Sequence, residues 1–323
     1  MRVVFASLAA PGHAYPLVPL AVAAQRAGHD VHFAVGEEVH AALRGAGLAV
    51  LRPGDCFYEM YPEDLQPELE RLRAELVVHE WGLPGAAVAA ERAGIPSVWH
   101  GFGRMYPAGI GLDLPAEVAD RPHLDICPAS LQDPEFLATA ERIALRPVAF
   151  SPPGEAVRID GPFVYVTLGT SFGTPEVLRA AVAGVAGLGM RVVVAAGQVP
   201  PARLGHLPRN VAVHGWVAQA DVLPRATLVV HHGGSGTTLG ALAAGVPQLL
   251  LPQGADQFGN AAAVTTAGAG LTAESGANAD AIEDLAWRLL PGRGDEFRAA
   301  ARTIAAEIAR MPPPDDVVRD LMT

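Results

Sequence analysis

The most constraining feature of the sequence is a repeated alternation between short apolar runs and alanine-rich stretches of helical length. In the first half, four apolar runs alternate with three helix-like stretches, at residues 3–7, 16–27, 30–35, 39–46, 76–79, 85–93 and 97–100. A strand buried on both faces of a parallel sheet is apolar throughout, and its crossover connection is usually a helix. The alternation therefore predicts βα units and a parallel sheet that is covered on both faces.

The alternation stops at two proline-rich segments. We predict an irregular stretch over residues 104–135 and an interdomain linker over 147–162. The alternation then returns, with strands and helices expected at 163–168, 175–187, 191–195, 211–213, 227–231, 236–244, 248–251, 280–290 and from 295 onward. The fold class is therefore α/β, with two Rossmann-like, doubly wound parallel-sheet domains, 1–146 and 163–310, that face a central cleft.

Composition narrows the class of partner. Among 323 residues, 34 are acidic and 23 are basic, which gives a net charge of −11. Because nucleic acids and anionic membranes attract clustered Lys and Arg, we expect neither as a partner. The two cysteines, Cys56 and Cys127, form no CxxC pair, and no apolar run is long enough to span a bilayer. We expect a reduced cytoplasmic protein whose first apolar run is a strand rather than a leader.

The densest motif is a glycine cluster between a β-branched run and a helix-like stretch, Val229–Thr238. Glycines let the backbone approach a ligand closely, and the free N–H groups of a helix start attract anions. Ser235 and Thr237 add hydroxyl donors, and His232 adds an imidazole N–H. The motif therefore predicts an anion site, although a plain tight turn with a helix cap is the simpler alternative. Because the motif contains no Lys, it is not a Walker loop.

Two other interpretations of this motif are open. Gly234, Gly236 and Gly240 also form G-x-G-x-x-x-G, with Asp256 after the next strand-like run, as in some dinucleotide-binding enzymes. That pattern predicts an NAD(P)-dependent oxidoreductase. Another alternative is that the chain keeps this fold as a non-catalytic binding or helper protein.

A candidate base lies in the first loop. His13 follows the first apolar run and Glu80 ends the run at 76–79, so both belong at the carboxyl edge of one sheet. A histidine is the usual general base near neutral pH, and a carboxylate that accepts its N–H sets the tautomer. We predict a His13–Glu80 pair; the alternative is a structural hydrogen bond for His13 and a solvated loop carboxylate for Glu80.

Three sequence blocks give the chain a family resemblance. They are Gly12-His13-x-x-Pro16-x-x-Pro19-Leu20 with Ala27-Gly28-His29-x-Val31, then Gly215-Trp216-Val217-x-Gln219 with His232–Thr237, and Gly245-Val246-Pro247-Gln248 with Pro252–Gln257. Their order and spacing resemble family 1 glycosyltransferases with the GT-B fold, especially bacterial enzymes that modify macrolides, enediynes and other secondary metabolites.

The resemblance implies a role for each matching residue. His13 would deprotonate the acceptor, assisted by Glu80 where the family commonly has Asp. The donor site would comprise Gly169, Thr170, Trp216, Val217, Gln219, His232, Gly234, Ser235, Gly236, Thr237, Asp256 and Gln257. Trp216 would stack on the nucleobase and Val217 would contact its edge through the backbone, while Asp256 and Gln257 would bind the sugar. The acceptor site would include Gly12, Trp81, Phe102 and Met105, and for the two aromatic residues and Met105 a plain core role is equally expected.

The implied activity is inverting transfer of a (deoxy)sugar from a TDP-sugar or UDP-sugar to a hydroxyl of a hydrophobic natural-product aglycone, with no metal and no other cofactor. The resemblance also implies that residues 1–146 bind the acceptor, that 163–310 bind the nucleotide sugar, and that a helix over 311–323 crosses back to the first domain. Segments 55–75 and 103–123, which shape the acceptor pocket, are shorter here than is usual in the family. The sequence leaves the aglycone, the sugar and the oligomeric state open, with a homodimer as one option.

Overall fold

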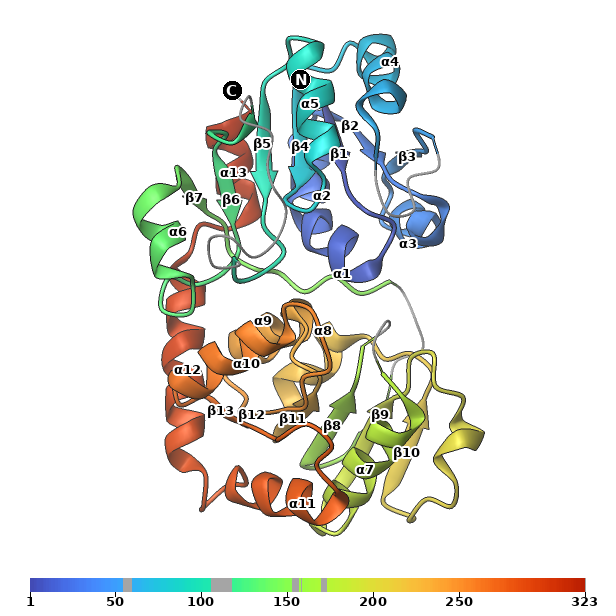
Figure 1. Cartoon of the computed structure of the whole chain (residues 1–323), viewed down its shortest axis with the longest axis vertical. Coiled ribbons are helices and arrows are strands. Elements are labelled where there is room, and N and C mark those ends of the chain that lie inside the picture. The colour runs from blue at the N-terminus through green and yellow to red at the C-terminus, as the bar shows by residue number, and fades with distance from the viewer. Residues whose placement is uncertain (55–59, 106–117, 153–156, 158, 170–172, 323) are drawn as a thin grey trace. The chain divides into compact units, whose positions relative to one another are not determined.

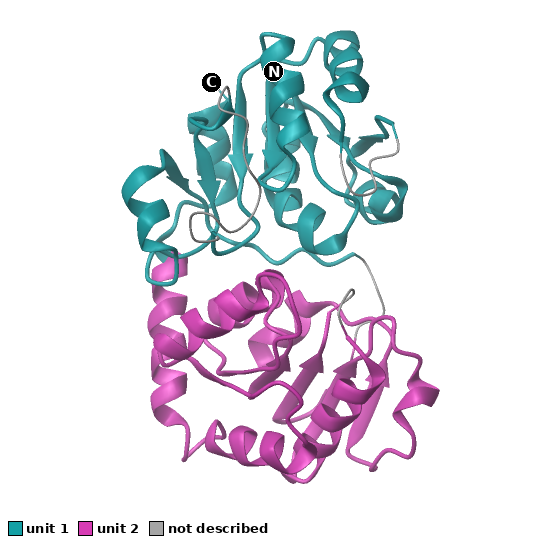
Figure 2. Ribbon diagram, in the orientation of Figure 1, with its two compact units in different colours: residues 1–153, 310–323 teal, residues 154–309 magenta. Residues whose placement is uncertain are grey.

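The computed structural model describes all residues except 55–59, 106–117, 153–156, 158, 170–172 and 323. The chain divides into two compact units (Figure 2). Unit 1 contains residues 1–153 and 310–323, and unit 2 contains residues 154–309. The division falls inside the segment 147–162 expected to be a linker. No helix in the described ranges is long and apolar enough to cross a membrane.

Unit 1 is built on a seven-stranded parallel sheet with the strand order β3-β2-β1-β4-β5-β6-β7 (Figure 1). Its strands are β1 (Arg2–Ala6), β2 (Asp30–Ala34), β3 (Ala49–Leu51), β4 (Leu76–Glu80), β5 (Ser97–His100), β6 (His123–Asp125) and β7 (Arg142–Ala144). Its helices are α1 (Pro11–Ala14), α2 (Val18–Arg26), α3 (His40–Gly45), α4 (Pro62–Leu72), α5 (Pro84–Arg92), α6 (Pro134–Thr139) and α13 (Pro314–Leu321).

Unit 2 repeats the design with six parallel strands in the order β10-β9-β8-β11-β12-β13. Its strands are β8 (Phe163–Thr167), β9 (Arg191–Ala195), β10 (Val211–His214), β11 (Leu228–His231), β12 (Gln248–Leu250) and β13 (Gly270–Thr272). Its helices are α7 (Pro175–Ala186), α8 (Gln219–Val222), α9 (Ser235–Ala243), α10 (Gln257–Thr266), α11 (Ala279–Arg288) and α12 (Asp295–Arg310).

The core of unit 2 shows why its strands are apolar throughout. Val164 and Val166 of β8 pack into one buried cluster, whereas Phe163 and Tyr165 of the same strand pack into a second cluster. Successive side chains of a strand point to opposite faces, so both faces of the sheet are covered. The predicted doubly wound, parallel α/β domains are confirmed.

The prediction of an irregular stretch over 104–135 is wrong where the chain is described. Strand β6 and helix α6 both begin within it. Strand β6 has three residues and includes a buried His and a buried Asp, so its sequence carries no apolar run. It is a strand because β5 and β7 offer their backbone hydrogen-bonding groups on either side.

The C-terminal helix α13 is part of unit 1. Pro313 caps its start and Pro314 is its first residue, a position where the missing N–H of proline costs nothing. Its Val317 is buried, and Asp315 forms an ion pair with Arg26 of α2. This short helix therefore covers part of the first unit although 156 residues of unit 2 precede it.

Candidate functional site

In unit 1, the strand order reverses between β1 and β4. The connections that leave these two strands turn to opposite faces of the sheet, and open α/β sheets usually bind ligands at the carboxyl edge beside such a switch point. Ala6 of β1 pairs with His79 of β4, which brings the loop after β1 beside Glu80. Short helix α1 follows that loop and carries His13.

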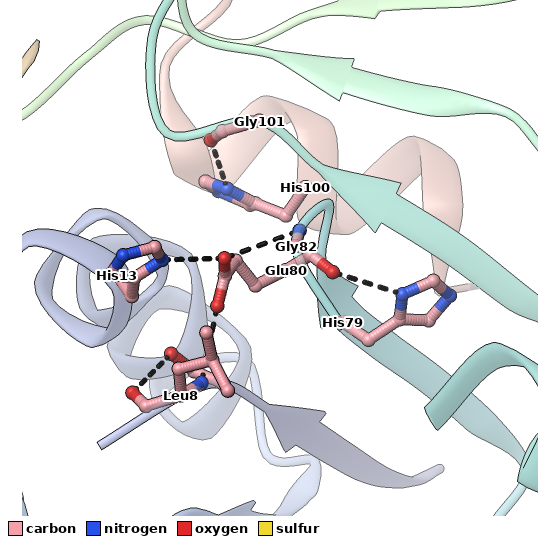
Figure 3. A network of polar contacts seen from close by, with 8 residues as sticks. Leu8, His13, His79, Glu80, Gly82, His100 and Gly101 are labelled. Atoms are coloured by element: carbon pink, nitrogen blue, oxygen red, sulfur yellow. Dashed lines mark hydrogen bonds and ion pairs between the residues drawn. The ribbon is translucent and has the colours of Figure 1, made fainter. Parts of the chain in front are cut away.

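His13 and Glu80 meet at this edge, as predicted (Figure 3). Nδ1 of His13 lies 2.6 Å from Oε1 of Glu80. The backbone N–H of Gly82 donates to the same oxygen at 3.2 Å, and that of Leu8 donates to Oε2 at 3.1 Å. The Glu80 side chain is fully buried, whereas that of His13 is 35% exposed. A carboxylate only accepts hydrogen bonds, so Nδ1 of His13 carries the hydrogen and Nε2 keeps its lone pair.

Gly82 is necessary for this geometry. A Cβ atom at Gly82 would lie 2.4 Å from Oε1 of Glu80, well inside contact distance. The short turn after β4 thus leaves room for the carboxylate to reach His13 while the turn's own N–H group binds it.

Apolar side chains flank the imidazole. The ring of Phe102 lies 5.1 Å from that of His13 and 6.3 Å from that of Trp81. Trp81 is buried in a cluster with Trp99, and Phe102 and Met105 pack against that cluster. Gly12 is exposed on α1. Among the predicted acceptor residues, Phe102 thus lies beside the candidate base, and the acceptor contacts themselves stay predictions.

Sequence reasoning missed His100, which lies across the strand pair from Glu80. The two residues are register partners on β4 and β5. Nδ1 of His100 donates to the carbonyl of Gly101 at 2.6 Å, and its buried Nε2 has no hydrogen-bond partner among the described residues. Burial lowers the pKa of His100 to about 4, so it is neutral near pH 7. The signal was a polar residue ending a buried strand, the same signal that singled out Glu80.

In unit 2, the equivalent switch point lies between β8 and β11. Thr167 of β8 pairs with His231 of β11, so the loops that follow leave the sheet side by side. Gly169 has a φ of +70°, and a Cβ there would lie 2.6 Å from Cε1 of His232. The structure thus brings the predicted donor residues Gly169 and His232 together. Thr170 lies outside the described residues.

The glycine loop opens helix α9. Its N-cap is Gly234, which has no side chain to bind the first N–H groups of the helix. A Cβ at Gly234 would lie 2.4 Å from Nε2 of His232, so glycine lets the imidazole lie over the helix start. Nδ1 of His232 is buried and makes no hydrogen bond within the described part of the chain. Burial lowers the pKa of His232 to about 4, and the negative charge of Asp256 offsets only part of this decrease.

The neighbouring His231 has a structural role. Its Nδ1 accepts the N–H of Gly233 at 3.1 Å, and its Nε2 donates to Oε1 of Gln248 at 2.7 Å. Both ring nitrogens of a neutral imidazole are thereby used, and burial lowers the pKa of His231 to about 3. Of the two histidines in the motif, only His232 has a nitrogen left for a ligand.

Polar residues surround the glycine loop. The Ser235 hydroxyl donates to Oδ2 of Asp256 at 2.7 Å, and the Thr237 hydroxyl donates to Oε1 of Gln219 at 3.2 Å. Gln257 is buried, and its Oε1 accepts the N–H groups of Gln253 and Gly254. The side-chain oxygen of Gln257 therefore binds the loop before it, and its predicted sugar contact stays a prediction. Gly236 is exposed on the first turn of α9.

Trp216 and Val217 have different environments. Trp216 is 42% exposed, whereas Val217 is buried in the core beneath it. Their loop adjoins the Gly169 loop through Gly197, whose N–H donates to the carbonyl of Gly215 and whose added Cβ would lie 2.5 Å from the Gly169 carbonyl oxygen. The aromatic surface of Trp216 is thus available on the side of unit 2 that carries the glycine loop.

Within the described part of the chain, no group of three or more His, Cys, Asp or Glu residues is arranged to hold a metal ion.

Comparison with known sequences gives a consistent set of relatives. Residues 179–323 match the family model for the Erythromycin biosynthesis protein CIII-like, C-terminal domain. The L-demethylnoviosyl transferase of Streptomyces niveus is 35% identical over 378 residues, covering 99% of this chain and 97% of the relative. Elloramycin glycosyltransferase ElmGT of Streptomyces olivaceus is 33% identical over 387 residues, covering 100% and 97%. Both alignments are longer than 323 residues, so each relative has segments that this chain lacks.

Solved structures agree. Spinosyn Rhamnosyltransferase SpnG complexed with thymidine diphosphate is 27% identical, with a TM-score of 0.83 and coverage of 100% of both chains. The same protein complexed with spinosyn aglycone gives a TM-score of 0.82 at the same identity and coverage. These matches confirm the predicted GT-B fold class.

Proposed function

Because the chain belongs to the glycosyltransferases of macrolide and polyketide antibiotic pathways, we propose that it transfers a sugar from TDP to a hydroxyl of a hydrophobic aglycone, with inversion and without a metal. The observation that carries this proposal is the 2.6 Å contact between His13 and a fully buried Glu80 at the edge of the first sheet. A partly exposed imidazole with a buried carboxylate behind it is suited to take a proton from a bound hydroxyl.

The proposed chemical step is a single displacement. Nε2 of His13 takes the proton of the acceptor hydroxyl while the hydroxyl oxygen forms a bond to the anomeric carbon of the donor sugar. The bond between that carbon and the diphosphate oxygen breaks, and TDP leaves with the electron pair. One displacement inverts the anomeric carbon. Glu80 pairs with the imidazolium that forms and keeps Nε2 directed at the acceptor.

The leaving diphosphate needs compensation for its charge. The start of α9 supplies N–H groups that no cap occupies, and the helix dipole favours an anion there. His232 supplies a further donor over the same turn. This set of groups supports a metal-independent reaction, since it performs the electrostatic work that a bound cation performs elsewhere.

The nucleotide and the sugar are assigned to neighbouring groups of unit 2. Trp216 would stack on the base, and Asp256 would bind sugar hydroxyls. The relative SpnG, whose structure was solved with thymidine diphosphate, supports TDP rather than UDP. We also propose a cytoplasmic location, because the two cysteines form no paired motif.

The test is a calorimetric titration of the protein with TDP, UDP and NADPH, each with and without EDTA. We expect TDP to bind most tightly and EDTA to leave its affinity unchanged. Binding of NADPH alone would instead favour the oxidoreductase alternative, in which the Gly234 loop holds a dinucleotide. Loss of TDP binding in EDTA would contradict the metal-independent mechanism.

The second test addresses the base. His13→Ala should abolish turnover with a TDP-sugar and an acceptor from an aglycone screen, while TDP affinity stays within about twofold because His13 belongs to unit 1. Full turnover by this variant would refute the assignment of His13.

A further inference from the structure

One buried amide joins the two loops that form the proposed donor site. Nδ2 of Asn260 lies 2.9 Å from the carbonyl oxygen of Gly233, 3.0 Å from Oγ of Ser235 and 2.9 Å from Oδ2 of Asp256. Asn260 comes from α10 and is 5% exposed. Gly233 belongs to the loop after β11, Ser235 is the first residue of the helix α9 that follows this loop, and Asp256 ends the loop after β12.

The hydrogen bonds in this cluster have a definite direction. Carbonyl and carboxylate oxygens only accept, so the amide of Asn260 donates to Gly233 and Asp256. The Ser235 hydroxyl donates to Oδ2 of Asp256 at 2.7 Å, which leaves its own lone pairs facing the amide. Two donors therefore converge on Oδ2. Because both of these donors bind Oδ2, Oδ1 is the oxygen of Asp256 that remains for a ligand.

The backbone before Asp256 is strained. Ala255 has a φ of +52°, in the left-handed region that costs a residue with a Cβ roughly 1–2 kcal/mol. Such a conformation persists only where surrounding contacts hold it, and it is common at ligand sites. The bonds from Asn260 and Ser235 to Asp256 are contacts of this kind, on the C-terminal side of the strained residue.

We infer that Asn260 is a positioning residue for the donor sugar: it sets Oδ1 of Asp256 at a fixed distance from the diphosphate loop. The inference rests on the proposed function, because it takes the Gly233–Ser235 loop as the diphosphate site. A sugar hydroxyl reaches Oδ1 only if both loops keep their spacing, and Asn260 bonds directly to both. Trp216, the proposed stacking partner of the nucleobase, is not a member of this cluster.

The test compares two ligands in two variants. Asn260→Leu removes the amide at nearly constant volume. Asn210→Leu is the matched control, because the Asn210 amide donates to two backbone carbonyls of the same unit, at Ala186 and Met190. Calorimetry gives the affinity of each protein for TDP and for TDP-glucose, and thermal melts give the Tm.

We expect both variants to lose thermal stability. Asn260→Leu should weaken TDP-glucose about tenfold more than it weakens TDP, whereas Asn210→Leu should leave the ratio of the two affinities unchanged. If Asn260→Leu does not fold, Ser235→Ala removes the other donor to Oδ2 and should move the ratio in the same direction.

Failure of the inference and failure of the proposed function give different results. Equal weakening of both ligands in Asn260→Leu, or a lower Tm with no change in the ratio, would reduce Asn260 to a structural role and overturn the inference while leaving the proposed function intact. Wild-type protein that binds TDP but not TDP-glucose would overturn the sugar-side role of Asp256. Wild-type protein that binds neither would refute the proposed donor site itself, and the inference with it.

Discussion

Replacing Glu80 with glutamine gives the sharpest test of the pair in unit 1, because the geometry predicts the result for either orientation of the new amide. In the native protein Oε1 accepts from His13 and Gly82, and Oε2 accepts from Leu8. A glutamine has one oxygen. If that oxygen takes the Oε1 position, the amide NH2 faces the N–H of Leu8 and leaves it unsatisfied, at about 1–3 kcal/mol.

In the opposite orientation the amide NH2 faces Nδ1 of His13. The imidazole then carries its hydrogen on Nε2, which can no longer take a proton from the acceptor. In both orientations the charge that pairs with the imidazolium is lost. We therefore expect Glu80→Gln to lower kcat on the order of 10²- to 10⁴-fold, the usual contribution of a positioned acid–base group.

The assay is TDP release with a TDP-sugar and an acceptor from the screen, alongside a thermal melt. The KM for the donor should stay nearly constant because the side-chain partners of Glu80, namely His13, Gly82 and Leu8, all belong to unit 1. Glu80→Asp is the control: it keeps the charge but shortens the side chain, so its kcat should fall between the other two proteins. A folded Glu80→Gln protein with near wild-type kcat at pH 7 would refute the role of the carboxylate.

Three further predictions concern single residues. Gly169→Ala should weaken TDP binding at least tenfold in calorimetry because its Cβ would lie 2.6 Å from His232. The control is Gly189→Ala, which has a similar φ of +72° and open space around it, so it should lose only roughly 1–2 kcal/mol of folding stability to backbone strain and keep its TDP affinity. Equal TDP affinities in the two variants would exclude the steric argument. Trp216→Ala should weaken TDP by about 1–3 kcal/mol, the usual value of a base stacked on an aromatic ring, with little change in Tm since the ring is 42% exposed; an unchanged Kd would place the base elsewhere. Burial lowers the pKa of His123 from 6.5 to about 4, so the unfolded chain binds a proton that the folded chain does not, and stability should fall as the pH drops from 6.5 to 4, by up to about 3 kcal/mol for this residue. Urea unfolding at pH 7 and pH 5 should show a smaller loss for His123→Gln than for wild type, and the same loss in both proteins would contradict the assignment.

Much of the fold and of the site was accessible from local sequence. Apolar, β-branched runs such as Phe163–Thr167 predict strands without reference to any neighbour, because a strand covered on both faces must be apolar throughout. His13 in the loop after the first run, Glu80 at the end of a later run and the glycine loop at Gly234 follow from the same pattern. Parallel strands bring their carboxyl ends to one edge of a sheet, so the sequence predicts His13 and Glu80 at that edge of the first sheet and the glycine loop at that edge of the second.

Other features depended on the tertiary structure. Strands β6 and β7 contain no apolar run, and they form because neighbouring strands pair with them. Helix α4 contains Pro67, which local rules count against a helix interior. His100 lies beside Glu80 because of the register between β4 and β5, which no single segment of the sequence determines.

The contacts of Asn260 illustrate why local sequence does not predict these features. Its partners Gly233 and Ser235 lie 27 and 25 residues away, and the bonds form only once β11 and β12 pair and α10 begins at Gln257. Periodicity and capping act over one or two turns of chain, so they identify elements and the loops that end them. Which side chains then meet, and which oxygen of Asp256 is left for a ligand, depends on the pairing of strands far apart in sequence, and the folded structure alone specifies it.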